Sequence, residues 1–269
     1  MGSGIAQVCA QNGFYTLLYD INTEGIEKAK TAIQKNLNYL VDKQKISVEE
    51  KSTIFNRIKF VTDTNDCIAD VFIEAIVEKV EAKVSIFNQL AEVNHSEAIF
   101  ATNTSSLSIS AIQAGIQNPA RVVGMHFFNP APLMKLVEVV KGEQTSDEAA
   151  QTVYDLCKQL NKTPVICKDA PGFIVNRVAR HYYLEAMNLV EQGNATIENV
   201  DELMEATGFK MGPFKLMDLI GMDINLAVTQ SLYHAFNGEE RFKPSSLQIN
   251  KVAANELGKK TGKGFYNYN

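Results

Sequence analysis

One histidine and one acid are spaced so that they could pair, which would allow the histidine to act as a base. His126 ends the apolar run 122–125, a pattern typical of a buried strand, and Glu138 lies inside a second apolar run, 136–140. A loop with two prolines turns the chain between them. Because an unpaired buried carboxylate is costly, His126 is its expected partner, and a paired imidazole can act as a base through its other nitrogen. A core histidine beside an outward-facing glutamate on an edge strand is the alternative.

The totals describe an ordinary globular chain. It has 269 residues, of which 45% are hydrophobic and 21% charged, enough for one large domain or two smaller ones. The net charge of -5 argues against a nucleic-acid partner held by a general basic field. No apolar run approaches the roughly 20 residues that cross a bilayer, and no secretory signal is visible. We expect no membrane association.

The cysteines and histidines suggest no metal site. The four cysteines are scattered through apolar or strand-like surroundings, and none shares a metal-ligand spacing with the four histidines. They are interpreted as reduced thiols, which predicts a cytoplasmic protein. The cysteines are Cys9, Cys67, Cys157 and Cys167.

The N-terminus contains half of a dinucleotide-binding pattern. Gly2 opens a helix-like run of small residues, and a short strand then ends at Asp20. A glycine at a helix start lets a pyrophosphate approach the backbone N–H groups, and an acid after the second strand binds the adenosine ribose. A small-residue helix packed on a neighbour is the alternative.

The first strand of that pattern and its first two glycines are not in the sequence. In such a sheet the first strand is central and hydrogen-bonded on both sides. We therefore expect that the sequence is part of a natural chain longer by roughly a dozen residues. The chain as written should then bind dinucleotide poorly and be unstable, an expectation that tight NAD binding would refute.

Residues 23–57 predict a helical hairpin. Apolar residues recur at helical spacing, and Ser47 with Glu50 forms a capping box at the start of the second helix. Lysines of the hairpin, Lys43 among them, could meet a phosphorylated ligand or could simply form a solvated face.

Strands then alternate with helices, which predicts a mostly parallel sheet covered on both faces. The expected strands are 58–62, 70–77, 98–103, 121–126, 136–140 and 163–167, with a helix at 79–92. Ligands of such sheets bind at the carboxyl ends of the strands. Polar residues collect there, which predicts one active cleft; they are Asp20, Glu78, Asn103, Ser105 and His126. Residues 103–106 could instead form a turn before a helix cap at Ser108 or Ser110.

The pattern changes near Pro171, where a Pro-Gly pair ends the strands and helices follow to the end. We therefore predict a first domain over residues 1–170 and an all-α domain over 171–269, which we expect to dimerise. Asn176 lies early in the long helix 173–193, where it can face the cleft or the surface. The glycine- and aromatic-rich tail suggests no role.

Seven strings together resemble the 3-hydroxyacyl-CoA dehydrogenase family, in order and spacing. The chain closely resembles the short bacterial members that act on 3-hydroxybutyryl-CoA, and the one departure is the missing N-terminal strand. The strings are GSGIAQ, EAIVE, TNTSSL, GMHFFNPAPLMKLVEVV, KDAPGFIVNR, GPFKLMDLIG and GKKTGKGFYNY. The resemblance implies a Rossmann-type NAD-binding domain, followed by a helical domain that dimerises.

The resemblance also implies roles for single residues. His126 is expected to be the general acid/base that Glu138 orients, while Ser105 and Asn176 bind the substrate's 3-oxygen and acyl region. Cofactor contacts are expected from Asp20, Glu78, Lys83 and Asn103, and a CoA contact from Lys43. NAD is favoured over NADP because Asp20 would repel a 2′-phosphate.

Two other functions remain open. A non-catalytic, crystallin-like relative would be expected to have lost one of four residues that are all present, Ser105, His126, Glu138 or Asn176. A dehydrogenase of the same fold could act on a free hydroxy acid or sugar acid, although the lysine-bearing hairpin favours a CoA thioester.

Overall fold

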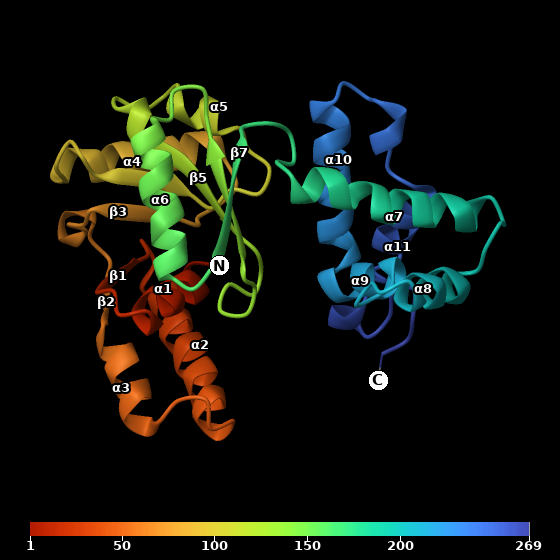
Figure 1. Cartoon of the computed structure of the whole chain (residues 1–269), viewed down its shortest axis with the longest axis horizontal. Coiled ribbons are helices and arrows are strands. Elements are labelled where there is room, and N and C mark those ends of the chain that lie inside the picture. The colour runs from red at the N-terminus through yellow and green to blue at the C-terminus, as the bar shows by residue number, and fades with distance from the viewer. Residues whose placement is uncertain (269) are drawn as a thin grey trace. The chain divides into compact units, whose positions relative to one another are not determined.

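The computed structural model describes residues 1–268, and the chain divides into two compact units, Met1–Asp169 and Ala170–Asn269. The first unit combines strands and helices, and the second is helical (Figure 1). An α/β domain followed by an all-α domain is the fold class predicted from the sequence, and it is confirmed.

The first unit contains a five-stranded sheet in the order β3-β4-β5-β6-β7, and a parallel two-stranded sheet of β1 and β2. All neighbours in the larger sheet are parallel except β5 and β6, because their connection is too short for the crossover that a parallel pair needs. The strands are β1 (Thr16–Tyr19), β2 (Ile58–Val61), β3 (Val71–Glu74), β4 (Ile99–Thr102), β5 (Val122–Phe127), β6 (Leu136–Lys141) and β7 (Thr163–Lys168).

Strand β3 is shorter than expected. The sequence suggested a strand over residues 70–77, but the chain leaves the sheet after Glu74. The Glu74 carboxylate accepts a hydrogen bond from the backbone N–H of Ile76 at 2.6 Å, so the backbone turns where the strand would have continued. Glu78 therefore lies in a loop beyond the strand.

Helices surround the sheet of the first unit. They are α1 (Gly2–Gln11), α2 (Thr23–Asp42), α3 (Val48–Asn56), α4 (Val80–Val93), α5 (Ile109–Gln113) and α6 (Asp147–Gln159), with short 3-10 helices η1 (Thr64–Asp66) and η2 (Pro119–Arg121). Helices α2 and α3 form the predicted hairpin, and the capping box of Ser47 and Glu50 is confirmed. Ser108 caps α5, one of the two positions proposed. Helix α6 was not anticipated.

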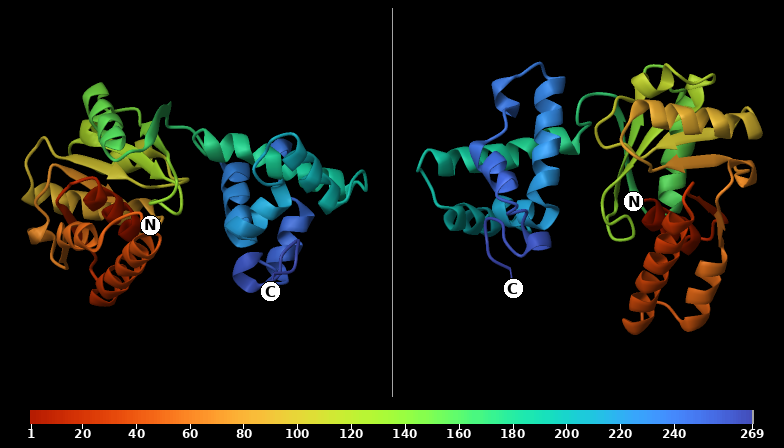
Figure 2. Two further views of the ribbon diagram at one scale, coloured as in Figure 1. Left: turned by 60° about the horizontal axis from the view of Figure 1, so that its bottom comes forward. Right: turned by 180° about the vertical axis from the view of Figure 1, so that it is seen from behind.

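Helix α1 packs into both apolar clusters of the first unit. Its Ile5 and Val8 join the cluster formed by the sheet and α6, while Ala6 and Ala10 join the cluster under the hairpin. Strand β5 is buried along its whole length, as expected for a central strand covered on both faces. Figure 2 shows the sheet of this unit between its helices. The core therefore fixes α1 and β5, the two elements on which the cofactor and proton-transfer predictions rest.

The second unit is helical, as predicted, with two isolated β-bridges in its tail. Its helices are α7 (Val175–Glu191), α8 (Ile197–Ala206), α9 (Pro213–Ile220), α10 (Met222–Ala235) and α11 (Ser246–Ala253), with 3-10 helices η3 (Glu240–Phe242) and η4 (Lys259–Thr261). Helix α9 was not anticipated; it begins with a proline at its first position. Across residues 1–268, no helix has the length and apolarity needed to cross a membrane.

The tail, for which the sequence suggested no role, closes over two buried acids. Asp218 accepts hydrogen bonds from the backbone N–H groups of Phe265 and Tyr266 and from the hydroxyl of Tyr268. Asp201 accepts one from the hydroxyl of Tyr266. A Cβ on Gly264 would collide with the Asp218 carboxylate, so the tail needs glycine there. The tail is therefore part of the helical core.

Candidate active site

His126 and Glu138 face each other across the antiparallel pair β5–β6. The strand register places them directly opposite, and His126 Nδ1 lies 2.8 Å from Glu138 Oε2. Glu138 is 1% exposed and His126 is 6% exposed. The pairing expected from the sequence is present, and the alternative of an outward-facing glutamate on an edge strand is wrong because β6 lies between β5 and β7. Because an ionised carboxylate can only accept hydrogen bonds, His126 Nδ1 carries the hydrogen of this bond. Nε2 is then the ring nitrogen that can exchange a proton with a substrate.

Ser105 lies in the loop that follows β4, and Glu78 holds this loop. Glu78 Oε1 accepts hydrogen bonds from Ser105 N at 3.0 Å, Thr104 Oγ1 at 2.5 Å and Ser106 Oγ at 3.2 Å. Burial alone would raise the pKa of Glu78, but the hydrogen bond from Thr104 and the charge of Lys83 outweigh it and lower that pKa. Glu78 is therefore an ionised anchor for the Ser105 loop.

Lys83, predicted to lie along the cofactor, is buried in an ion pair with an acid that the sequence analysis missed. Its Nζ lies 2.7 and 2.8 Å from the two carboxylate oxygens of Glu74, and 3.2 Å from Glu78 Oε2. Lys83 is 1% exposed and Glu74 is 6% exposed. The ammonium therefore acts on its surroundings through Glu78. A single acid in an apolar strand, the signal that identified Glu138, could also have identified Glu74.

Asn103 connects this cluster to the strand of His126. Its backbone N–H donates to Glu74 O at 2.8 Å, and its side-chain Oδ1 accepts from Phe127 N at 2.8 Å. Five predicted site residues of the first unit and Glu74 are thus brought into neighbouring positions at the ends of β3, β4 and β5; the five are Glu78, Lys83, Asn103, Ser105 and His126.

Two of the predicted cofactor-binding residues, Gly2 and Asp20, lie near the start of the chain. Gly2 is the first residue of α1, and no acid lies in the first turn of this helix. Asp20 follows β1 and accepts from Asn22 N at 2.8 Å. Gly25 lets this carboxylate lie against α2, because a Cβ there would come within 2.5 Å of Asp20 Oδ2. The absence of an acid in the first turn of α1 is compatible with a phosphate there, and the roles of Gly2 and Asp20 stay predictions.

Lys43 and Asn176 lie in other parts of the chain. Lys43 is exposed at the end of α2, with its Nζ 5.8 Å from the centre of the Tyr39 ring. Asn176 is the second residue of α7, in the second unit, and is half-buried. The roles of Lys43 and Asn176 stay predictions.

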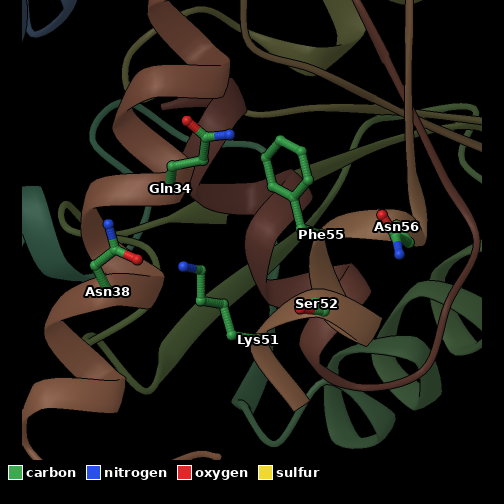
Figure 3. A pocket seen from close by; sticks show the side chains of 6 residues that line it. All are labelled: Gln34, Asn38, Lys51, Ser52, Phe55 and Asn56. Atoms are coloured by element: carbon green, nitrogen blue, oxygen red, sulfur yellow. The ribbon is translucent and has the colours of Figure 1, made fainter. Parts of the chain in front are cut away.

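A groove of about 420 Å³ opens between α2 and α3 (Figure 3). Amide, hydroxyl and ammonium groups and one phenyl ring line it, from Gln34, Asn38, Lys51, Ser52, Phe55 and Asn56. No residue predicted for catalysis or cofactor binding is among them, so the groove is not part of the candidate site.

Metal and thiol chemistry find no support in residues 1–268. No group of three or more histidine, cysteine, aspartate or glutamate side chains there is placed to hold a metal ion. All four cysteines are free thiols, and burial raises the pKa of Cys9, Cys157 and Cys167 to about 12. These three thiols are therefore poor nucleophiles near neutral pH.

Comparison with known proteins gives matches over nearly the whole chain. The model of the NAD binding domain of 3-hydroxyacyl-CoA dehydrogenase matches residues 1–170, and that of the C-terminal domain matches residues 172–268. The 3-hydroxyadipyl-CoA dehydrogenase of Escherichia coli is 47% identical over all of this chain, which spans 57% of that protein's length. The 3-hydroxybutyryl-CoA dehydrogenase of Clostridioides difficile is 41% identical, again over the whole chain and over 96% of its own length.

A solved structure supports the same likeness. The crystal structure of a 3-hydroxybutyryl-CoA dehydrogenase from Escherichia coli matches with a TM-score of 0.96 and 47% identity, over the whole chain and 57% of that structure's chain.

Proposed function

The chain belongs to the 3-hydroxyacyl-CoA dehydrogenase family, and on that premise we propose that it interconverts a 3-hydroxyacyl-CoA and the corresponding 3-oxoacyl-CoA with NAD. The observation that carries the proposal is the buried pair of His126 and Glu138, which prepares one imidazole nitrogen for proton transfer. The first unit is an NAD-binding domain of this family, and bound NAD supplies the hydride acceptor.

The proton steps follow from the pair. In oxidation, His126 Nε2 takes the proton of the substrate's 3-hydroxyl while the C3–H electron pair leaves as hydride and the C3=O double bond forms. Glu138, on Nδ1, then stabilises the imidazolium. In reduction, His126 returns the proton to the forming alkoxide. Ser105 and Asn176 would hold the 3-oxygen and the acyl region, and Lys43 would meet the CoA.

The cofactor contacts are assigned to residues of the first unit. Gly2 would bind the pyrophosphate, and Asp20 would bind the adenosine ribose. Glu78 and Asn103 would lie along the remainder of the cofactor, and Lys83 would act on the cofactor through Glu78. Asp20 also supports NAD over NADP, because a carboxylate repels a 2′-phosphate.

The remaining assignments concern the second unit and the location. We propose that a boundary at residues 170–171 separates the NAD-binding domain from a domain that contributes to the substrate cleft and forms a homodimer. Exposed apolar side chains of this unit, Leu203, Phe209, Leu219, Ile224 and Ile249, support pairing with a second copy. The free thiols support a cytoplasmic location.

The substrate test is NADH oxidation with acetoacetyl-CoA, 3-oxoadipyl-CoA and free acetoacetate. We expect both thioesters to react, with acetoacetyl-CoA preferred, and free acetoacetate to react at least about 100-fold more slowly in kcat/KM, because it lacks the CoA contacts that supply binding energy. The assay is followed at 340 nm, where NADH absorbs.

Each alternative function has its own outcome in that assay. A non-catalytic, crystallin-like relative would leave NADH unchanged with every substrate. A dehydrogenase of free hydroxy acids or sugar acids would reduce acetoacetate or another free oxo acid as fast as the thioester. If 3-oxoadipyl-CoA turned over faster than acetoacetyl-CoA, the preferred substrate would be the six-carbon thioester and not the four-carbon one.

Glu138→Gln should lower kcat by about 10- to 100-fold, the range seen when a carboxylate that orients a metal-bound histidine is replaced. Glutamine can still accept the hydrogen bond from His126 Nδ1, but it lacks the charge that stabilises the imidazolium. Stopped-flow turnover and fluorescence titration with NADH measure the two effects. Loss of NADH affinity with kcat retained would give Glu138 a different role.

A further inference from the structure

Two carboxylates share one ammonium in the first unit. Lys83 Nζ contacts both oxygens of Glu74 and one oxygen of Glu78. Glu74 receives only hydrogen-bond donors, namely Lys83, the Ile76 N–H and the Thr102 hydroxyl at 2.7 Å, so it is a carboxylate and not an acid. The cluster of Glu74, Lys83 and Glu78 therefore carries a net charge of -1. The charge of Glu74 cancels that of Lys83 and leaves that of Glu78 uncompensated.

This cluster lies close to the strand of His126. Glu74 pairs with Thr102 on β4, and Thr102 pairs with Gly124 on β5, two residues before His126. Neighbouring strands are about 4.8 Å apart, so Glu74 is about 10 Å from β5. Glu78 is nearer to the predicted substrate position, because it binds the backbone of Ser105.

We propose that Glu74 is a positioning residue that sets the charge of the nicotinamide site and so favours NAD⁺ over NADH. The inference rests on the proposed function, which requires the nicotinamide ring beside the carbon served by His126. That ring is positive in NAD⁺ and neutral in NADH. By neutralising Lys83, Glu74 leaves the negative charge of Glu78 to act on the ring, which lowers the free energy of bound NAD⁺ and not that of bound NADH.

A purely structural role for Glu74 predicts something different. Loss of packing or of the Ser105 loop would weaken both forms of the cofactor alike, because the two differ only in the nicotinamide ring. The ratio of the two dissociation constants therefore separates an electrostatic role from a structural one.

The experiment titrates wild-type and Glu74→Gln protein with NAD⁺ and with NADH. Calorimetry and NADH fluorescence measure the dissociation constants. The substitution keeps the shape of residue 74 but raises the cluster charge from -1 to 0. For a ring placed beside β5, about 10 Å from residue 74, Coulomb's law in effective dielectrics of about 40 to 20 gives a roughly 4- to 17-fold rise in Kd(NAD⁺)/Kd(NADH). An unchanged ratio would overturn the proposal.

Two further variants complete the test. Glu81→Gln removes the same charge from an exposed position on α4, where solvent screens it, so the ratio should stay within about twofold of wild type. The double variant Glu74→Leu/Lys83→Met replaces the buried pair by apolar groups, a change that proteins often tolerate, and keeps the net charge at -1. Its ratio should match wild type. A ratio in the double variant that lies about 4-fold or more above wild type would overturn the proposal, and this comparison does not need the single variant to fold.

The outcome also separates this inference from the proposed function. Protein that binds both NAD⁺ and NADH but reduces no 3-oxoacyl-CoA would refute the proposed function itself. Protein that binds both and reduces acetoacetyl-CoA, but whose ratio does not respond to Glu74→Gln, would refute only the role of Glu74.

Discussion

Replacing His126 by alanine lowers turnover of the 3-oxoacyl-CoA by about 10²- to 10⁴-fold, the usual contribution of a positioned proton-transfer group. The imidazole is the group whose Nδ1 is held by Glu138 at 2.8 Å, and alanine leaves nothing to protonate the forming alkoxide. Steady-state kcat with saturating NADH and thioester measures the effect, and NADH affinity should change little because the side chain is assigned to the substrate.

A second histidine of the same unit provides the control. His95 is exposed and lies 3.3 Å from Asp70, outside the candidate site. His95→Ala should keep wild-type turnover. If a correctly folded His126→Ala protein also kept it, His126 would not be the acid/base.

Replacing Asp218 by alanine should lower the free energy of unfolding of the helical unit by about 3–5 kcal/mol. Asp218 is 1% exposed and accepts three hydrogen bonds from the tail, at 2.9, 2.9 and 3.0 Å. Removing the carboxylate leaves two backbone N–H groups and a tyrosine hydroxyl without their acceptor, and each such group costs about 1–3 kcal/mol when buried. Urea unfolding followed by circular dichroism gives the difference.

The matched control is an aspartate on the surface of the same unit. Asp223 is 42% exposed and pairs with Lys260. Because water screens that pair, Asp223→Ala should cost less than about 1 kcal/mol. Equal losses in the two variants would mean that the tail does not depend on Asp218.

The parts of the site that could be predicted are those whose residue types conflict with their surroundings. A glutamate between valines and a histidine after an apolar run stand out in the sequence, and the structure joins them. Asp20 was singled out as a polar residue at a strand end; it does follow β1, and its role stays a prediction. Capping chemistry is local, so the box at Ser47 and Glu50 could be predicted as well.

The parts that could not be predicted depend on contacts between distant segments. Glu74 was read as one position of a longer strand, and only the fold shows that Lys83, nine residues later on α4, turns back onto it. Asp218 and the tail meet across 47 residues, so nothing local marks the acid or explains the glycines. The burial of Lys83 could not be predicted for the same reason, since burial is decided by packing and not by spacing.

The loop between β5 and β6 has a consequence for how this protein can vary. Strand β6 is buried on both faces, so its apolar side chains do not select one alignment against β5. A register shift of one residue would put Val137 or Val139 opposite His126, and either valine would suit the apolar core equally well. Glu138 marks the correct alignment, because only one register places its carboxylate opposite His126. Insertions or deletions in the loop are therefore tolerated only if Glu138 still lies opposite His126. The pair proposed for proton transfer thus also fixes the register of the β5–β6 hairpin.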